Sequence, residues 1–307
     1  MVETLAVTVI VLVVAYGMSL WASKARTDRS ANVGLYLVFG SPAVLLIVAG
    51  AAFALSGSRD GLTFLAIGLG LGLPLVKQFR LQLARVTPID PASPIDMVGL
   101  SVILAIMASL TVIYLAKPSP DDSTGSVNLT QLLLQVVLFV ALALVLVGTG
   151  VYRSFRESVE RLGLMRKPTP RIVAIALGAV ILALIISSMA SLATRTFQPD
   201  VYDQLEQVTR DMTADVRNPL GALILGLSAG IGEELLLRGA IQPRFGIFMT
   251  SLLFALLHTQ YGLTFVLVGL FLIGAMLGKM RERYGTAAPI ITHAVFNVIV
   301  VLAQTAK

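Results

Sequence analysis

The feature that most constrains this chain is a series of long apolar blocks. Five blocks of 19 to 23 residues carry no charged side chain apart from Asp96, and they cover residues 4–22, 33–55, 95–116, 129–151 and 172–194. An apolar run of about 18 residues can cross the hydrocarbon core of a bilayer as a helix. Shorter apolar stretches at 62–76, 219–237, 247–260, 263–277 and 286–302 raise the expected number of spans. The sequence predicts an all-α, polytopic transmembrane helix bundle of about ten spans.

The composition supports a membrane solvent and excludes several kinds of site. Charged residues make up 13% of the chain, about half the roughly 25% of a soluble domain. The chain has no cysteine, which excludes disulfides, thiolate nucleophiles and cysteine-based metal sites. The net charge of +6 lies mainly in short loops beside apolar blocks, as the positive-inside rule describes. We therefore expect the lipid bilayer, and not nucleic acid, as the partner.

The loop charges predict an orientation. The loops 23–32 and 152–171 are basic, whereas the loop 195–218 is acidic, and basic loops alternate with neutral or acidic ones along the chain. This alternation favours both termini outside. The first block has no basic segment before it, so we expect a retained helix and not a cleaved signal. No eukaryotic targeting or retention signal is evident, and a bacterial plasma membrane is the simplest host.

Two loops are expected to hold surface helices. Val201, Leu205, Val208, Met212 and Val216 fall on one helical stripe opposite acidic residues, and Phe155, Val159 and Leu162 do the same among basic residues. Such amphipathic stretches suit a helix in the headgroup region. An ordinary solvated loop helix explains the first stretch equally well.

Ionisable residues within apolar segments are concentrated in the last third of the chain. Glu233 and Glu234 end an apolar stretch, and His258 and His293, the only two histidines, follow. Such groups are costly within a bilayer and usually functional. Glu234 and Arg238 are i,i+4 neighbours that can form an ion pair, for which an interfacial position is expected. Glu233 points about 100° away from Glu234 on an α-helix and stays available for chemistry.

Distances along the helices predict that these groups meet. Pro243 and Gly246 mark a turn, and Glu233 and His258 each lie roughly 18 Å from it at ~1.5 Å per residue. His293 comes from the last apolar stretch, and Asn297 lies one turn further along it. The polar groups are therefore expected to converge in the cytoplasmic half of the bundle.

Two kinds of chemistry suit such a cluster. A carboxylate and an imidazole can hold a water molecule and take its proton, while a second imidazole and an amide stabilise the oxyanion formed on a carbonyl. Alternatively, Glu233, His258 and His293 could bind zinc as a His₂Glu site with an open position. The metal-free version is favoured, and zinc stays possible. The H-E-x-x-H signature of many zinc proteases is absent.

Three motifs resemble a known family. They are E-E-x-x-x-R at 233–238, F-x-x-x-H at 254–258 and H-x-x-x-N at 293–297. In this combination the chain resembles the CAAX-protease and bacteriocin-processing membrane proteins, also called CPBP or Abi proteins, over roughly residues 170–305. The resemblance implies an intramembrane endopeptidase in which Glu233 and His258 activate water, and His293 and Asn297 stabilise the oxyanion. It gives Glu234, Arg238 and Phe254 structural or substrate-orienting roles.

The sequence also suggests a division of the chain and leaves alternatives open. Residues 1–170 would supply N-terminal transmembrane helices of unknown role and a basic cytoplasmic loop, and residues 171–305 the catalytic transmembrane domain. The expected substrate is a membrane-associated peptide or protein, for example a prenylated tail or a leader peptide. A catalytically silent scaffold or immunity protein is the first alternative. A proton-coupled transporter is another, although related halves are not evident.

Overall fold

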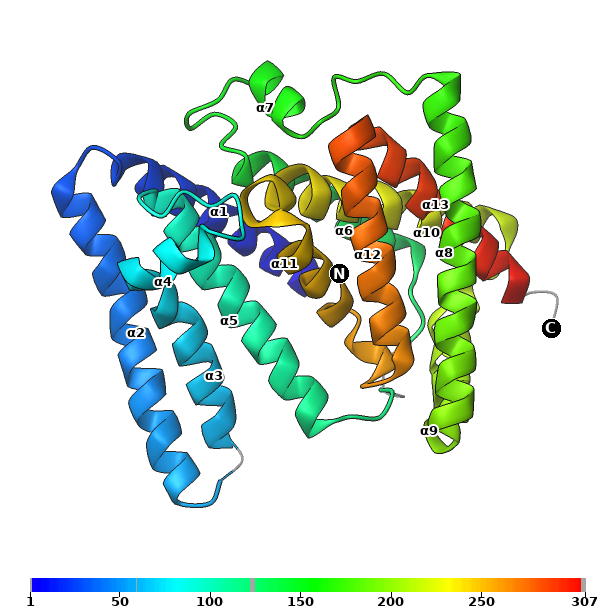
Figure 1. The fold of residues 1–307 in the computed structure, drawn as a ribbon, viewed down its shortest axis with the longest axis horizontal. Helices are drawn as coiled ribbons and strands as arrows, with labels where there is room; N and C mark the ends of the chain where they lie inside the picture. The colour runs from blue at the N-terminus through cyan, green and yellow to red at the C-terminus, as the bar shows by residue number, and fades with distance from the viewer. Residues whose placement is uncertain (1, 59, 122–124, 305–307) are drawn as a thin grey trace. The chain divides into compact units, whose positions relative to one another are not determined.

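The computed structural model describes residues 2–58, 60–121 and 125–304 and confirms the all-α prediction (Figure 1). In these residues the only β-type pairing is an isolated bridge between Thr149 and Arg153. The α-helices are α1 (Val2–Lys24), α2 (Arg29–Leu55), α3 (Asp60–Gly72), α4 (Lys77–Leu83), α5 (Pro94–Ala116), α6 (Leu129–Leu146), α7 (Phe155–Arg161), α8 (Pro170–Phe197), α9 (Pro199–Met212), α10 (Pro219–Glu233), α11 (Gln242–Leu256), α12 (Phe265–Tyr284) and α13 (Ala287–Ala303).

The number of membrane-spanning helices is lower than expected. Six helical stretches in the described residues are long and apolar enough to cross a bilayer, or seven if α3 and α4, which are bent by 85°, count as one broken span. The prediction of about ten spans is not confirmed. One stretch, Pro219–Leu256, covers two predicted spans, and α13 has only 17 residues. The last turns of α12 carry Lys279, Arg281 and Arg283, which shortens its apolar part.

The chain from α10 to α11 changes helix type and then bends. A π-helical segment, Glu234–Ile241, follows α10 directly, and α11 begins at Gln242. Gly246 interrupts α11 with φ 81° and ψ 169°, a conformation that glycine adopts at little cost. The turn predicted around Pro243 and Gly246 is therefore present as a break in the helix.

Contacts divide the chain into two compact units, of which the smaller comprises residues 16–116 and 244–246. In this unit α2 packs on α3, and α3 packs on α5. The helices α3 and α5 approach closely because a glycine of α3 lies against the backbone of α5. A Cβ at Gly70 would lie 2.6 Å from the backbone of Ala105. An ion pair joins Arg244 to Asp96, whose other oxygen accepts the Asp90 N–H at 2.8 Å. The short bend segment is thus held by α5.

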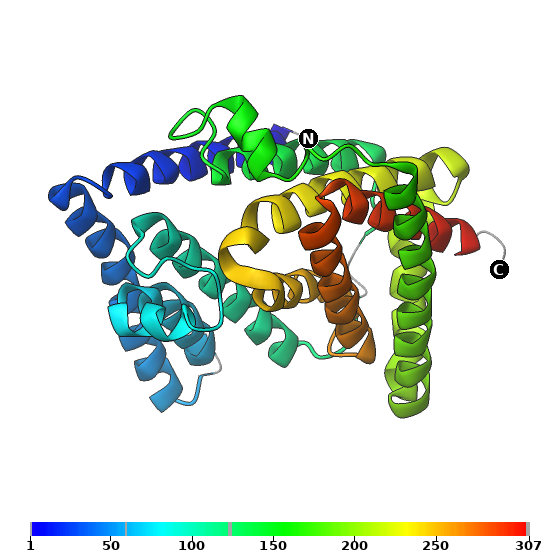
Figure 2. The same cartoon turned by 45° about the horizontal axis from the view of Figure 1, so that its top comes forward.

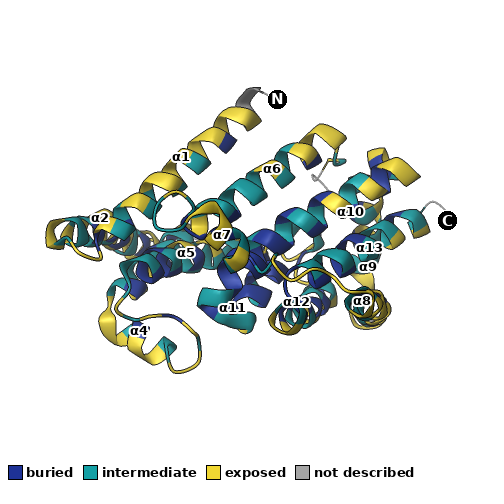
Figure 3. Cartoon of the chain, turned by 90° about the horizontal axis from the view of Figure 1, so that it is seen from above, coloured by how far each residue is buried: buried dark blue, intermediate teal, exposed yellow. Residues whose placement is uncertain are grey.

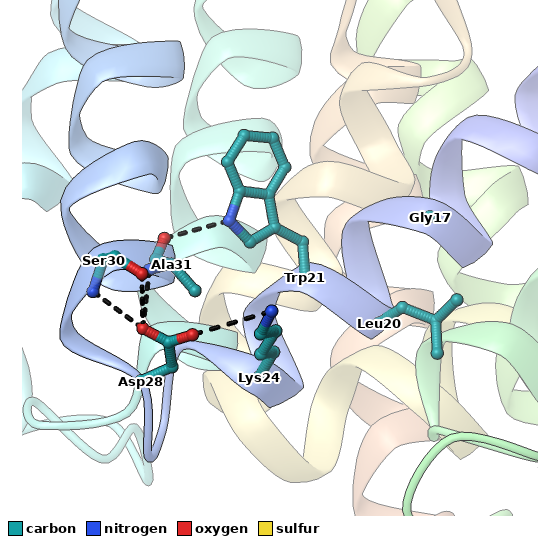
Figure 4. A pocket seen from close by; sticks show the side chains of 7 residues that line it. All are labelled: Gly17, Leu20, Trp21, Lys24, Asp28, Ser30 and Ala31. Carbon is teal, nitrogen blue, oxygen red and sulfur yellow. Dashed lines mark hydrogen bonds and ion pairs between the residues drawn. The ribbon is translucent and has the colours of Figure 1, made fainter.

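The turn between α1 and α2 forms a small hollow in the same unit (Figure 4). Trp21 Nε1 donates to the Ala31 carbonyl at 2.9 Å, and the Asp28 carboxylate caps α2 by accepting from the Ser30 and Ala31 N–H groups. These hydrogen bonds, together with the Lys24–Asp28 ion pair at 3.6 Å, fix the angle between the two helices.

The larger unit contains residues 1–15, 117–243 and 247–307. Its central helix is α10, which packs on α6 and α13, while α8 packs on α12 and α13 (Figure 2). Gly226 and Gly230 bring α10 and α13 together, because a Cβ at either would lie within 3 Å of Ala294. Figure 3 shows burial along α10, whereas α8 presents many exposed residues.

Both predicted surface helices are present as α7 and α9. Leu205 and Val208 on α9 and the following Val216 are buried, so this stripe packs against the protein. In α7 the side chain of Leu162 at its C-cap is buried, whereas Phe155 is 66% exposed and does not join the packed face. The headgroup position of these helices stays a prediction.

Candidate active site

Five of the seven predicted site residues line one cavity of the larger unit. The cavity has a volume of about 930 Å³ and is formed by parts of α6 and α8 to α13. Its lining includes Glu233, Phe254, His258, His293 and Asn297. Most of the other lining residues are aliphatic or aromatic, so the polar groups project into a largely apolar space.

The two glutamates separate at the point where α10 ends. Glu233 is the last residue of α10, is partly exposed and lines the cavity. Glu234 begins the π-helical segment and is completely buried. Segments of π-helix are rare and frequently occur at functional sites. One carboxylate therefore faces the cavity, whereas the other lies in the bundle interior.

Glu234 belongs to a buried network of three charged or polar side chains. Its Oε1 accepts from Arg238 Nη1 at 3.0 Å and lies 2.8 Å from His293 Nδ1. The predicted Glu234–Arg238 ion pair is therefore present. Both side chains are at most 1% exposed, so the pair lies inside the protein, and its expected interfacial position stays a prediction. The ion pair lies within the π-helical segment, and the contact of Glu234 with His293 connects that segment to α13.

The Phe254 ring contacts both histidines and Arg238. Its ring lies edge-on to both imidazoles, with centroid distances of 4.9 Å to His258 and 5.9 Å to His293. The Arg238 guanidinium lies over the same ring at 4.5 Å. Offset and edge-to-face aromatic contacts fix the relative orientation of rings, and Phe254 thereby orients both histidines.

His258 lies just past the end of α11, not within a helix as the sequence suggested. Its backbone (φ −95°, ψ 52°) has left the helix, and a short 3₁₀ turn, Thr259–Tyr261, follows. The Nδ1 atom of His258 lies 2.8 Å from the Phe254 carbonyl. A carbonyl can only accept, so Nδ1 carries the hydrogen and Nε2 of the neutral ring has a free lone pair.

The side chains of Glu233 and Asn297 form no hydrogen bond or ion pair with other described residues. Among the residues that the structure describes, neither side chain makes a hydrogen bond or ion pair, although both line the cavity. Glu233 interacts electrostatically with both imidazoles. Polar groups in an apolar surrounding normally find a partner, so these two are available for a bound molecule.

A ready-made metal site is not among the described residues. No three histidine, aspartate or glutamate side chains in this part of the chain are placed so that they could hold an ion. Glu233, His258 and His293, the alternative zinc ligands, line the same cavity without forming such a group.

Tyr261 is a site residue that the sequence did not single out. Its ring stacks on His258 with an interplanar angle of 10° and a centroid distance of 6.1 Å, and it lines the cavity. Its position three residues after His258 in a turn gives no helical pattern that would reveal the contact. His258 is thus flanked by Phe254 and Tyr261.

Comparison with known proteins gives one match. Residues 215–299 match the family model described as type II CAAX prenyl endopeptidase Rce1-like. This segment contains all three motifs and confirms the resemblance stated from the sequence, while residues 1–214 lie outside the match. No curated protein and no solved structure matches the chain. Together with the long apolar helices, the match supports an integral membrane protein that is similar to CAAX prenyl endopeptidases over residues 215–299.

Proposed function

We propose that this protein is an intramembrane endopeptidase that hydrolyses a peptide bond of a membrane-associated substrate with a water molecule activated by Glu233. One observation carries the proposal: Glu233, His258, His293 and Asn297 present atoms without internal partners to a single cavity. A carboxylate, a proton-accepting imidazole and hydrogen-bond donors around one space are what amide hydrolysis without a covalent intermediate requires.

In the first step, water attacks the carbonyl carbon of the substrate. The Glu233 carboxylate and Nε2 of His258 hold the water by accepting its hydrogen bonds, and one of them takes the proton as the new C–O bond forms. The contact between His258 Nδ1 and the Phe254 carbonyl keeps Nε2 free of hydrogen for this role. The carbonyl π electrons move onto oxygen and produce a tetrahedral oxyanion.

In the second step, the intermediate breaks down. The Asn297 amide and Nε2 of His293 donate hydrogen bonds to the oxyanion. His293 can donate from Nε2 while Nδ1 donates to Glu234 only as an imidazolium. The Glu234 carboxylate, which it shares with Arg238, and the nearby Glu233 carboxylate stabilise that positive charge. The electron pair returns to re-form the carbonyl, the C–N bond breaks, and the proton held by the Glu233–His258 pair passes to the leaving amine.

The substrate is proposed to be an extended peptide segment at the membrane, such as a prenylated tail or a leader peptide. The mostly apolar lining of the cavity suits apolar side chains or a lipid group. Enclosure in such a space also strengthens the electrostatic contacts of the site, because few water molecules screen them.

Cysteine labelling can determine the side of the membrane on which the cavity opens. The depth estimate favours the cytoplasmic half, whereas Tyr202 and Glu206 of α9, from the acidic loop expected outside, also line the cavity. The chain lacks cysteine, so single cysteines at the exposed positions Arg156 and Gln207 can be labelled from either side of sealed vesicles. Labelling of the Gln207 position from outside only would place the α9 side of the cavity outside.

A catalytically silent scaffold or immunity protein is the main alternative. Purified protein in liposomes, incubated with membrane-anchored peptides and followed by mass spectrometry, separates the two functions. An endopeptidase cleaves the peptide, and the His258→Ala variant does not. A scaffold binds its partner without cleavage in either form, whereas a proton-coupled transporter changes proton flux instead.

A further inference from the structure

One face of α8 presents a line of polar side chains to the cavity. Ser187, Ser191 and Arg195 are spaced four residues apart and all line the cavity that contains Glu233 and His258. Residues at this spacing lie on the same side of an α-helix. None of the three belongs to the motifs of the family, and residues 170–214 lie outside the segment that matches the family model.

The hydroxyls of Ser187 and Ser191 face the cavity without an internal hydrogen bond. Neither Ser187 nor Ser191 bonds to any group that the structure describes. Two threonines of the same helix instead bond back to the carbonyl four residues earlier: Thr194 to Ala190 at 3.0 Å and Thr196 to Leu192 at 2.8 Å. The hydroxyls on the cavity face of α8 therefore keep both donor and acceptor capacity for a ligand.

Their spacing matches the repeat of an extended peptide. Four residues of α-helix advance about 6 Å, and two residues of an extended chain advance about 6.6 Å. Hydroxyls at Ser187 and Ser191 can thus bond to main-chain groups two residues apart on the same edge of one bound strand. Arg195 follows about 6 Å further along, which corresponds to two more residues of the peptide.

Arg195 offers a positive charge at the end of this line. It forms no ion pair with any described carboxylate, and its guanidinium lies over the Tyr202 ring at 5.8 Å. Arg210, which also lines the cavity, is paired with Glu206 at 2.8 Å. Arg195 therefore has its charge available for an anionic group, and a guanidinium binds a carboxylate with two parallel hydrogen bonds.

We propose that Ser187, Ser191 and Arg195 form a substrate-binding rail: the two hydroxyls hold the main chain of an extended peptide, and Arg195 binds its free C-terminal carboxylate. The inference rests on the proposed endopeptidase function. It adds a defined ligand chemistry, a peptide that ends in a carboxylate about four residues beyond the main-chain group held by Ser187.

Binding tests the rail without relying on cleavage. Fluorescent peptides with a free C-terminal carboxylate or a C-terminal amide are titrated onto purified Glu233→Gln protein, and the Kd is read from anisotropy. The free acid is expected to bind about tenfold more tightly than the amide, and Arg195→Gln should abolish that preference. Ser187→Ala/Ser191→Ala should weaken both peptides about tenfold, from two lost hydrogen bonds.

Two control variants test whether the effect is specific to the side chains of α8 that face the cavity. Thr196→Val removes a hydroxyl that bonds only within α8, and Arg210→Gln removes a paired arginine; neither should change the preference for the free acid. Equal binding of acid and amide by the parent protein, or unchanged binding in both rail variants, overturns the rail. If the unmodified protein cleaves no peptide, the endopeptidase proposal fails, and the binding data still decide whether the rail recognises peptides.

Discussion

The Glu234 carboxylate lies 2.8 Å from Nδ1 of His293 while it also pairs with Arg238 at 3.0 Å. This arrangement makes the second glutamate of the pair the anchor of an imidazole on α13. The first glutamate, Glu233, is left to face the cavity. Neighbouring residues of identical type thus occupy different positions: successive helical residues point in different directions, and Glu233 ends α10 where Glu234 begins the π-helical segment.

Loss of the Glu234 carboxylate should destabilise the fold. Glu234→Ala leaves the buried Arg238 without its counter-charge, and breaking a buried pair in this way costs about 3–5 kcal/mol. Thermal unfolding in detergent should show a large fall in Tm. The control Glu282→Gln removes an exposed pair with Lys279, which is worth about 0–1 kcal/mol. Similar Tm values for the two variants would show that the buried network does not stabilise the protein.

Asn297 should matter for the chemical step more than for substrate binding. Asn297→Ala removes a donor that has no internal partner, so the fold loses little. If the amide stabilises the oxyanion, kcat should fall by about 10²–10³ with KM nearly unchanged. Steady-state kinetics on a peptide substrate measures kcat and KM separately and so checks this prediction. A change confined to KM would move Asn297 from the oxyanion site to a substrate contact.

A larger residue at Gly230 should disrupt the packing of α10 against α13. A Cβ there would lie 2.9 Å from Ala294, one residue from His293, whereas a Cβ at Gly178 of α8 has no neighbour within 4 Å. Gly230→Leu is expected to push α13 away from α10 and to lower both activity and Tm. Gly178→Ala should leave activity unchanged and stabilise α8 slightly, by up to about 1 kcal/mol. Equal activity and Tm in both variants would contradict this account of the crossing.

Metal removal is expected to leave activity intact. The proposed chemistry uses Glu233 and His258 to activate water directly, so treatment with a strong zinc chelator should not reduce cleavage. Metal analysis of the active protein should find zinc well below one ion per chain. Loss of activity on chelation, restored by added zinc, would instead support the His₂Glu site with Glu233, His258 and His293.

The sequence predicted the elements of the site better than the details of the fold. The spacing of Glu234 and Arg238 indicated their ion pair, and the two histidines stood out because ionisable residues are rare in apolar segments. The burial of that pair and its bond to His293 could not be foreseen, because they depend on a π-helical segment and on the approach of α13. Helical spacing also placed His258 inside a helix, since nothing in the local pattern marks the end of α11 at Leu256.

The span count failed for a related reason. Apolar stretches indicate helices, but their boundaries depend on charges and on contacts elsewhere in the chain. The stretch 219–237 and most of the stretch 247–260 fall in one interrupted helical run, Pro219–Leu256. The charged last turns of α12 remove that helix from the set that is apolar enough to cross a bilayer. The line of serines on α8 was likewise hidden, because a sequence does not show which hydroxyls bond back to their own helix.

The most direct test of the central claim is the rate of peptide cleavage by the Glu233→Gln variant in liposomes. Glutamine keeps the size of the side chain but cannot take a proton from water, so the account predicts a loss of at least about 10²-fold in kcat with an unchanged Tm and unchanged peptide binding. Glu282→Gln serves as the matched control and should cleave at the normal rate. Cleavage by Glu233→Gln at the rate of the unmodified protein would contradict the account.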